Sequence, residues 1–315
     1  MKPGITLVSC ALVAACASAS RTASPSPARF QAISLTGDTL RTLPISAATR
    51  ARYERQLAEA KASYDHTPTN PDSIIWYGRR LGYLGQMREA IEVYSRGIAL
   101  YPDNPWLYRH RGHRYISVRE LDKAIADFER ASKLVEGKPD EVEPDGQPNA
   151  QNTPIGTLHS NIDYHLALAH YLKGNFERAL PVYRKEFEGA RNDDRKVSIG
   201  HWYYMALRRL GRNEEAKEVL APITPAMNVI ENDGYHRLML LYKGLLPVDS
   251  VLAADASGEM SVTDATAAYG IGNWHLYNGR PAEARKVFDR IIAGGQWGAF
   301  GFIAAEAELA RRTVR

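Results

Sequence analysis

Two neighbouring stretches of sequence decide the fold: PDSIIWYGRRLGYLGQMREAIEVYSRGIALYPDN at residues 71–104 and PWLYRHRGHRYISVRELDKAIADFERASKLV at residues 105–135. A small residue in each of two successive helices lets the helices approach closely, and an aromatic ring fills the remaining gap. Both stretches therefore predict a helix hairpin, stacked on its neighbour in a repeat array. The matching residues are 34 positions apart and comprise Gly78 and Gly112, Ala90 and Ala124, Tyr94 and Phe128, and Gly97 and Ala131.

This pattern resembles the tetratricopeptide repeat (TPR) family, whose consensus has small and aromatic residues at these positions. The resemblance implies an all-α fold, a right-handed superhelical array of helix-turn-helix repeats with one long inter-repeat loop. It covers residues 46–312, and Ser46 is the expected N-cap of an incomplete first repeat. Full repeats are expected at about 71–104, 105–135, 160–190, 197–224 and 265–293, with further helices at 233–242 and 302–312, the last as a closing cap.

The N-terminus has a pattern of its own. Lys2 precedes an apolar run and then small residues, which predicts a signal peptide over residues 1–16. The run of roughly 11 residues is too short to cross a membrane, and no later segment is longer and more apolar, so we expect no transmembrane helix in the mature chain. Residues 17–45 are expected to be a flexible tether, rich in Ser, Ala and Pro, followed by an extended segment.

The end of the leader carries a possible lipid-anchor site. Val13, Ala14, Ala15 and Cys16 resemble the lipobox of bacterial lipoproteins, which implies lipidation at Cys16 and a place at the outer membrane or in the periplasm. Cleavage after Ala19 without lipidation is the alternative and gives a soluble periplasmic protein. The chain is expected to be exported in both cases.

Composition and charge narrow the function. The 315 residues are 44% hydrophobic and 24% charged, which is enough to form a core. The net charge of +4 is spread along the chain without a basic block, so we expect no nucleic-acid partner. Cys10 and Cys16 both lie in the leader and leave no disulfide in the body. No nucleotide, zinc or nucleophile motif is present, so we expect no cofactor and no catalytic residue, and an enzyme is less expected than a binding protein.

In the TPR family, the first helix of each hairpin lines a concave face that binds peptides. In this sequence, the corresponding positions hold aromatic, Arg, His and Asn side chains, several of which are enriched at binding hot spots. Each could instead pack against a neighbouring helix, because aromatic rings also fill core gaps. We expect a peptide or protein partner in a groove formed by Trp76, Arg79, Tyr83, Arg109, His110, His113, Arg114, Asn161, Tyr164, His165, His201 and Trp202.

Residues 136–160 interrupt the repeat, and their prolines and glycines exclude a helix. A loop of this length is either a solvated surface loop or a lid on the groove. A lid would bring its acids back onto the Arg and His side chains of the second repeat; these acids are Asp140, Glu141, Glu143 and Asp145.

An alternative function is a metal-dependent enzyme or small-molecule binder at the second repeat and this loop. His110 and His113 are three residues apart, which places both rings on one face of a helix and makes them weak candidates for metal ligands. The sequence shows no third ligand at a recognisable spacing, so we expect no metal.

Overall fold

The computed structural model describes residues 1, 29–41, 43–251 and 261–313. The predicted signal peptide and the lipidation site at Cys16 lie outside the described residues and stay predictions. Within these ranges the chain is helical apart from one small sheet, which confirms the predicted all-α repeat fold. No helix in the described part is long and apolar enough to span a membrane.

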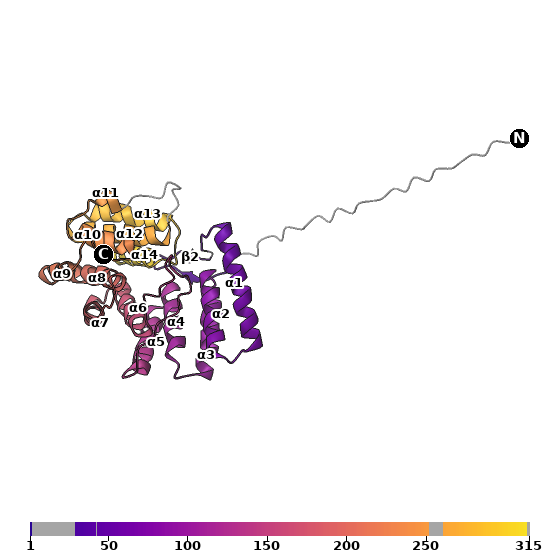
Figure 1. The fold of residues 1–315 in the computed structure, drawn as a ribbon. Helices are drawn as coiled ribbons and strands as arrows, with labels where there is room; N and C mark the ends of the chain where they lie inside the picture. The colour runs from indigo at the N-terminus through magenta and orange to yellow at the C-terminus, as the bar shows by residue number, and fades with distance from the viewer. Residues whose placement is uncertain (2–28, 42, 252–260, 314–315) are drawn as a thin grey trace.

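Most helices pair into hairpins at the five predicted repeats (Figure 1). Each of the first three hairpins packs against the next, so that the first helices α2, α4, α6 and α8 lie side by side. The third, fourth and fifth hairpins begin two to four residues earlier than expected. The hairpins are α2 (Pro71–Tyr83) with α3 (Met87–Leu100), α4 (Pro105–Ser117) with α5 (Leu121–Val135), α6 (Leu158–Lys173) with α7 (Phe176–Glu188), α8 (Asp193–Arg209) with α9 (Asn213–Leu220), and α12 (Val262–Tyr277) with α13 (Pro281–Ala293).

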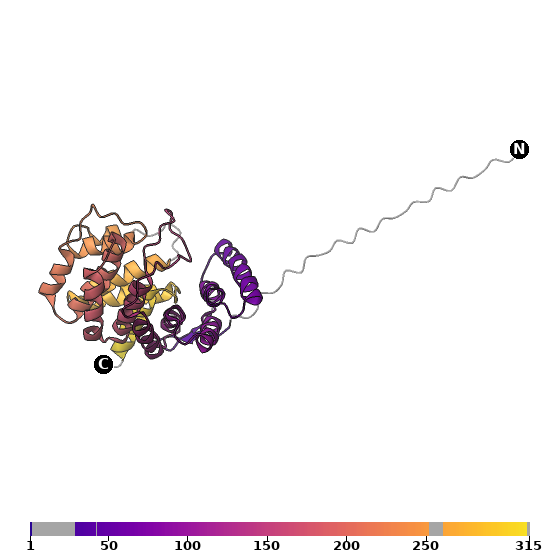
Figure 2. The ribbon, with the colours of Figure 1, turned by 60° about the horizontal axis from the view of Figure 1, so that its bottom comes forward.

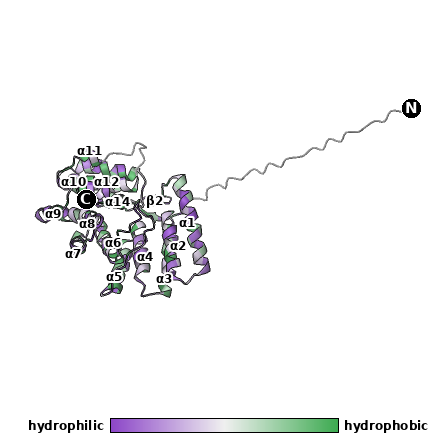
Figure 3. Ribbon diagram, viewed as in Figure 1, coloured by the Kyte–Doolittle hydropathy of each residue, from purple (hydrophilic) through white to green (hydrophobic). Residues whose placement is uncertain are grey.

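The remaining helices are α1 (Ala47–His66), α10 (Asp233–Tyr242), α11 (Val248–Val251) and α14 (Phe300–Thr313). The predicted N-cap of α1 is confirmed, because the Ser46 hydroxyl accepts a bond from the Thr49 amide at 3.2 Å. This helix has no buried residue and is largely hydrophilic along its length (Figure 3). It is the exposed end of the array, as an incomplete repeat should be.

Glycines facing aromatic rings hold the hairpins together, as the repeat pattern predicts. A Cβ atom on Gly78 would lie 2.5 Å from the ring of Tyr94, and one on Gly112 would lie 2.9 Å from the ring of Phe128. Both rings are buried. Any side chain at these two glycines would push the paired helices apart, which is why the same residue types recur at the same spacing.

The array turns back on itself after α9. In Figures 1 and 2 the C-terminal helices, in orange and yellow, gather beside α6 and α8 instead of continuing away from α1 to α5. Helix α14 contacts α6, and α12 contacts α8. In the α4–α5 turn, Arg119 pairs with Glu306 of α14 at 2.8 Å, although 187 positions separate the two residues. Both side chains are almost fully buried, so this ion pair joins the second repeat to the last helix.

Arg119 also has an unusual backbone. Its φ is 65°, a left-handed conformation that costs a non-glycine residue roughly 1–2 kcal/mol. The equivalent turn between α2 and α3 places Gly85 there, with a φ of 77°. Arginine therefore replaces the favoured glycine at the one turn where its guanidinium reaches Glu306.

The end of the 17–45 range is folded onto the array. Strands β1 (Ala32–Ile33) and β2 (Thr39–Leu40) pair antiparallel, with Ala32 and Leu40 buried. The Gln31 carbonyl accepts a bond from Arg88 Nε at 2.7 Å, and the Leu35 amide donates to Glu306 Oε2 at 3.4 Å. The predicted extended segment is thus a β-hairpin packed between the first repeat and α14.

Glu306→Gln should lower the free energy of unfolding by about 3–5 kcal/mol, because it leaves the buried Arg119 guanidinium without a counter-charge. Urea denaturation followed by circular dichroism measures the change. Glu214→Gln is the control, since Glu214 pairs with Lys217 on the exposed surface and should change stability by less than about 0.5 kcal/mol. Equal effects of the two substitutions would show that closure of the array contributes little.

Candidate functional site

Four of the five arginines on helices α2 and α4 form what we call the arginine cluster: Arg79, Arg80, Arg109 and Arg114. The fifth, Arg111, pairs with Asp127 of α5. The guanidinium groups of Arg79 and Arg80 lie 4.4 and 5.0 Å from the ring centroid of Trp76. Burial lowers the pKa of Arg114, and Arg109 and Arg79 are close enough to add to this effect. The cluster therefore concentrates positive charge in a partly buried place, where an anion is favoured.

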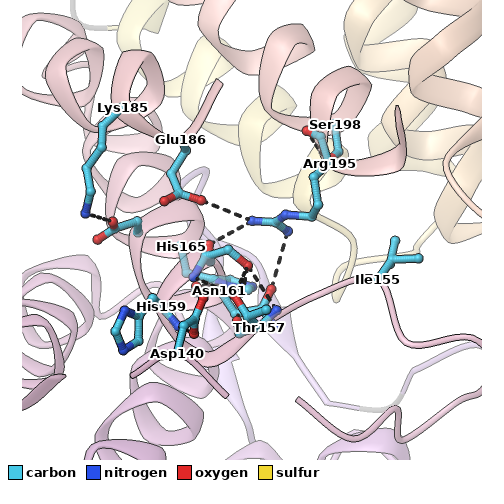
Figure 4. A network of polar contacts seen from close by, with 12 residues as sticks. Asp140, Ile155, Thr157, His159, Asn161, His165, Lys185, Glu186, Arg195 and Ser198 are labelled. Carbon is cyan, nitrogen blue, oxygen red and sulfur yellow. Dashed lines mark hydrogen bonds and ion pairs between the residues drawn. The ribbon is translucent and has the colours of Figure 1, made fainter. Parts of the chain in front are cut away.

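Residues 136–157 cross this part of the protein as an ordered segment that we call the strap. It has no helix, as predicted, and its ends are bonded to each other. The Glu143 amide donates to the Gly156 carbonyl at 3.0 Å, and Asp140 accepts a bond from the His159 amide at 3.1 Å (Figure 4). Asp140 thus caps the start of α6 and does not reach the arginine cluster.

Arg195 of α8 holds the first turn of α6, which directly follows the strap. Its guanidinium donates to the Ser160 carbonyl at 2.8 Å and lies 3.7 Å from Glu186; Figure 4 shows Arg195 facing Glu186. Burial raises the pKa of Glu186 to about 7. Asn192 donates to the Ile155 carbonyl at 3.1 Å. These contacts fix where the strap leaves the concave side.

Glu143 inserts between α4 and α6. Its Oε2 atom lies 2.9 Å from Arg109 Nε and accepts a bond from Asn161 Nδ2 at 2.8 Å. The side chains of Glu143 and Arg109 are 7% and 8% exposed, so the pair is withdrawn from water. The prediction that acids of this loop fold back onto the second repeat is correct for Glu143.

The next turn of the strap lies against α2 through its main chain. Arg80 Nη1 donates to the Gly146 carbonyl at 2.9 Å. A Cβ atom on Gly146 would lie 1.8 Å from the Tyr83 hydroxyl oxygen, so any other residue here would require the Tyr83 side chain to move. Burial raises the pKa of Asp145, and the nearby Arg79 opposes that rise. The strap is therefore recognised through carboxylates and a peptide carbonyl together.

The strap does not neutralise the cluster. Among the described residues, Glu143 is the one acid within ion-pair distance of any of the four arginines, and it pairs with Arg109. Glu141 is exposed to solvent and forms no ion pair with the cluster. Counting Asp145 and also Glu59 of α1, which lies near Arg80, four positive charges meet three negative ones, which leaves a surplus of one. The site can therefore attract further anionic groups.

His110 and His113 both face Arg109. Their Nδ1 atoms lie 3.2 and 3.5 Å from Arg109 Nη1, so these lone pairs are turned toward a cation. Burial lowers the pKa of both rings well below the ordinary value, and the arginines add to this effect. No group of three or more His, Cys, Asp or Glu side chains in the described part is arranged to hold a metal. The geometry gives the metal-dependent alternative no ligand set.

The predicted groove residues fall into two groups. Those on α2 and α4, together with Asn161 of α6, lie near the strap, whereas Tyr164, His165, His201 and Trp202 are covered by the C-terminal helices. His201 and Trp202 are fully buried, and Trp202 Nε1 donates to the Tyr164 hydroxyl at 2.9 Å. The prediction that these two line an open groove is wrong, because the array turns back over them. Half-buried are Trp76, Arg79, Tyr83, His113, Arg114 and Asn161, and buried are Arg109, His110, Tyr164 and His165.

A pocket of about 320 Å³ remains where α4, α10, α12 and α14 meet, and we call it the central pocket. Asn149 of the strap donates to Glu231 at its edge, at 3.1 Å. Apart from His113, sequence reasoning missed its residues, because α10 and α14 have no clear repeat register. The lining comprises His113, Glu231, Asn232, Gly234, Tyr235, Val262, Thr263, Thr266, Ala267, Gly298, Ala299 and Phe300.

No family model and no curated protein matches the sequence. Among solved structures, YrrB, described as a TPR protein with an unusual peptide-binding site, is similar with a TM-score of 0.41 and 16% identity, covering 79% of this chain and 97% of YrrB. A tetratricopeptide repeat protein from Parabacteroides merdae has a TM-score of 0.45 and 13% identity, covering 83% and 94%. BtubC from P. vanneervenii has a TM-score of 0.44 and 16% identity, covering 79% and 91%.

This chain has a TPR-like fold. Its helix hairpins and the glycine–aromatic contacts within them define that fold. The TPR-like hairpins differ from a simple open array in the return of α10, α12 and α14 and in the strap.

Stability of this TPR-like body should fall in acid. Burial lowers the pKa of His201 to about 3 from an ordinary value of 6.5, so the unfolded chain takes up the proton first as the pH falls below 6.5. From pH 6.5 to 5 this imidazole alone should remove about 2 kcal/mol of unfolding free energy. Urea denaturation at both pH values measures the unfolding free energy. The loss between pH 6.5 and 5 should be smaller by that amount in His201→Gln than in the wild-type chain. His66→Gln, at an exposed position, should leave the dependence unchanged; an equal dependence in all three proteins would contradict this.

Proposed function

We propose that this chain is a non-enzymatic binding scaffold whose arginine cluster receives an extended, acidic segment of a partner protein. The observation that carries the proposal is the buried ion pair of Glu143 with Arg109. Arginine binds carboxylates through directed, charge-assisted hydrogen bonds, and it is enriched at binding hot spots. The strap is an extended acidic segment already seated on the cluster, so this surface is shaped to hold one.

The strap would act as a tethered competitor for the partner. Because the strap is covalently attached, its effective concentration at the cluster is of millimolar order. A partner segment must therefore bind more tightly than the strap, or bind after the strap has left the cluster. The surplus positive charge favours a partner with more acids than the strap. The contact between Gly146 and Tyr83 favours a glycine at the matching position of the partner.

A synthetic peptide with the strap sequence EVEPDGQPNA, residues 141–150, tests this proposal. It should bind the Glu143→Gln variant at least about tenfold more tightly than the wild-type chain, because loss of a buried charge pair loosens the protein's own strap. Isothermal titration calorimetry at low salt measures both affinities.

The matched control is Glu141→Gln, which removes a charge from the same strap at an exposed position and should behave like wild type. Adding Arg109→Ala to Glu143→Gln should abolish binding of the peptide. Failure of Glu143→Gln to bind, or binding that survives Arg109→Ala, would reject the arginine cluster as the binding surface.

We further propose that the chain is exported and held at a bacterial membrane through a lipid on Cys16. The support is the leader pattern and the tether-like composition of residues 17–28, which would place the repeat body away from the membrane. A lipid at Cys16 would anchor only the N-terminus, so the arginine cluster could bind partners in the cell envelope or in solution.

Metabolic labelling with radioactive palmitate in a bacterial host tests the anchor. The wild-type chain and Cys10→Ser should incorporate label and fractionate with membranes, whereas Cys16→Ser should not, because the acylated residue is gone. Label that is lost in Cys10→Ser and kept in Cys16→Ser would move the anchor to the other cysteine. Absence of label in all three proteins would support cleavage without lipidation.

A further inference from the structure

The central pocket has the chemistry of an apolar anchor site. Rings of His113, Tyr235 and Phe300 contribute to its lining, and Val262 and Ala267 add aliphatic surface. The ring centroids of His113 and Phe300 are 5.3 Å apart. A volume of about 320 Å³ is at the small end of ligand pockets and is sufficient for one bulky apolar side chain.

The charge at the pocket separates it from the arginine cluster. Among the described residues that line the pocket, Glu231 is the one charged side chain. His113 is neutral, because burial lowers the pKa of its ring well below the ordinary value. None of the described residues that line the pocket is an arginine or a lysine. A carboxylate of the ligand would be repelled here and attracted at the cluster, whereas a neutral apolar side chain has no such penalty.

His113 and the strap connect the cluster to the pocket. His113 lines the pocket, and its Nδ1 atom lies 3.5 Å from Arg109 Nη1. The strap runs from one to the other, since Glu143 pairs with Arg109 and Asn149 donates to Glu231 at the pocket edge. A ligand that follows the strap therefore reaches the pocket about six residues after the acid that pairs with Arg109.

The strap itself brings no anchor to the pocket. Its residues nearest the edge are Gln147, Pro148, Asn149 and Ala150, none of which has a large apolar side chain. A partner with one would bury apolar surface that the strap leaves exposed to water. That difference gives a partner the advantage it needs over a tethered competitor.

We propose that the central pocket takes one bulky apolar side chain of the same partner segment, so that the ligand is an extended acidic segment with an aromatic or branched aliphatic residue about six positions after its Arg109-bound acid. This inference rests on the proposed function. It adds the feature that distinguishes a partner from the strap.

Four variants of the peptide EVEPDGQPNA, each with phenylalanine in place of one of its last four residues, test the proposal on the full-length Glu143→Gln chain. At least one should bind about tenfold or more tightly than the unmodified peptide, because burial of a phenyl ring adds to affinity. Thr263→Trp, at an exposed position on the pocket wall, should remove this gain and leave binding of the unmodified peptide unchanged. Ala282→Trp, exposed on α13, is the matched control and should keep the gain.

The outcomes separate the two proposals. If the unmodified peptide binds but none of the four gains affinity, or if the gain survives Thr263→Trp, the anchor site is rejected and the proposed function stands. If neither the unmodified nor the modified peptides bind, the proposed function itself fails. N-acetylphenylalanine amide is a further probe: equal affinity for the Glu143→Gln chain with and without Arg109→Ala, combined with no gain for the peptides, would make the pocket an independent small-molecule site and overturn the inference.

Discussion

The buried ion pair between Arg119 and Glu306 converts a row of helix hairpins into a closed body. It is formed by a turn of the second repeat and the last helix, and the β-hairpin joins it through the Leu35 amide. Removing two charges from water is costly, and paired geometry with two hydrogen bonds between the groups offsets that cost. Because the second repeat and the last helix are held together in this way, α10, α12 and α14 occupy the space beside α6 and α8 that an open array would leave as a groove.

Closure restricts where a ligand can reach. The concave side remains accessible at α2 and α4, where the arginine cluster lies, and at the central pocket beside it. The strap covers the arginine cluster and reaches the edge of the central pocket through Asn149. A long groove of many weak contacts is thus replaced by two short sites of different chemistry, one for carboxylates and one for an apolar side chain. Binding energy in such a site is concentrated in a few residues.

The fold could be read from the sequence because the signals for it are local. Each Gly–aromatic pair lies within one hairpin, as with Gly78 and Tyr94, and the Ser46 cap acts over three residues. The acidic composition of the loop likewise predicted its return to the second repeat. It did not tell which acid would pair, because Glu141 and Glu143 are identical residues in one short segment, and the contacts that seat Glu143 come from Arg109 of α4 and Asn161 of α6.

The closure was beyond the reach of the sequence for a physical reason. It depends on contacts between residues far apart in the chain, and no periodicity records them. The repeat position of Trp202 therefore predicts a groove residue. Its burial comes from α10 and α12, which lie later in the chain and contact α8. The repeat register does mark position 119 as one where glycine is expected, since Gly85 lies 34 positions earlier, but it does not reveal that Arg119 there reaches Glu306.

Closure also sets the number of repeats. In an open solenoid, gene duplication can add or remove a hairpin at small cost, because each unit touches only its neighbours. Here a hairpin added between the α4–α5 turn and α14 would rotate and shift α14 relative to that turn, and Glu306 would no longer reach Arg119. Closure therefore constrains the number of hairpins in this part of the chain, whereas the exposed end at α1 is not constrained by that ion pair.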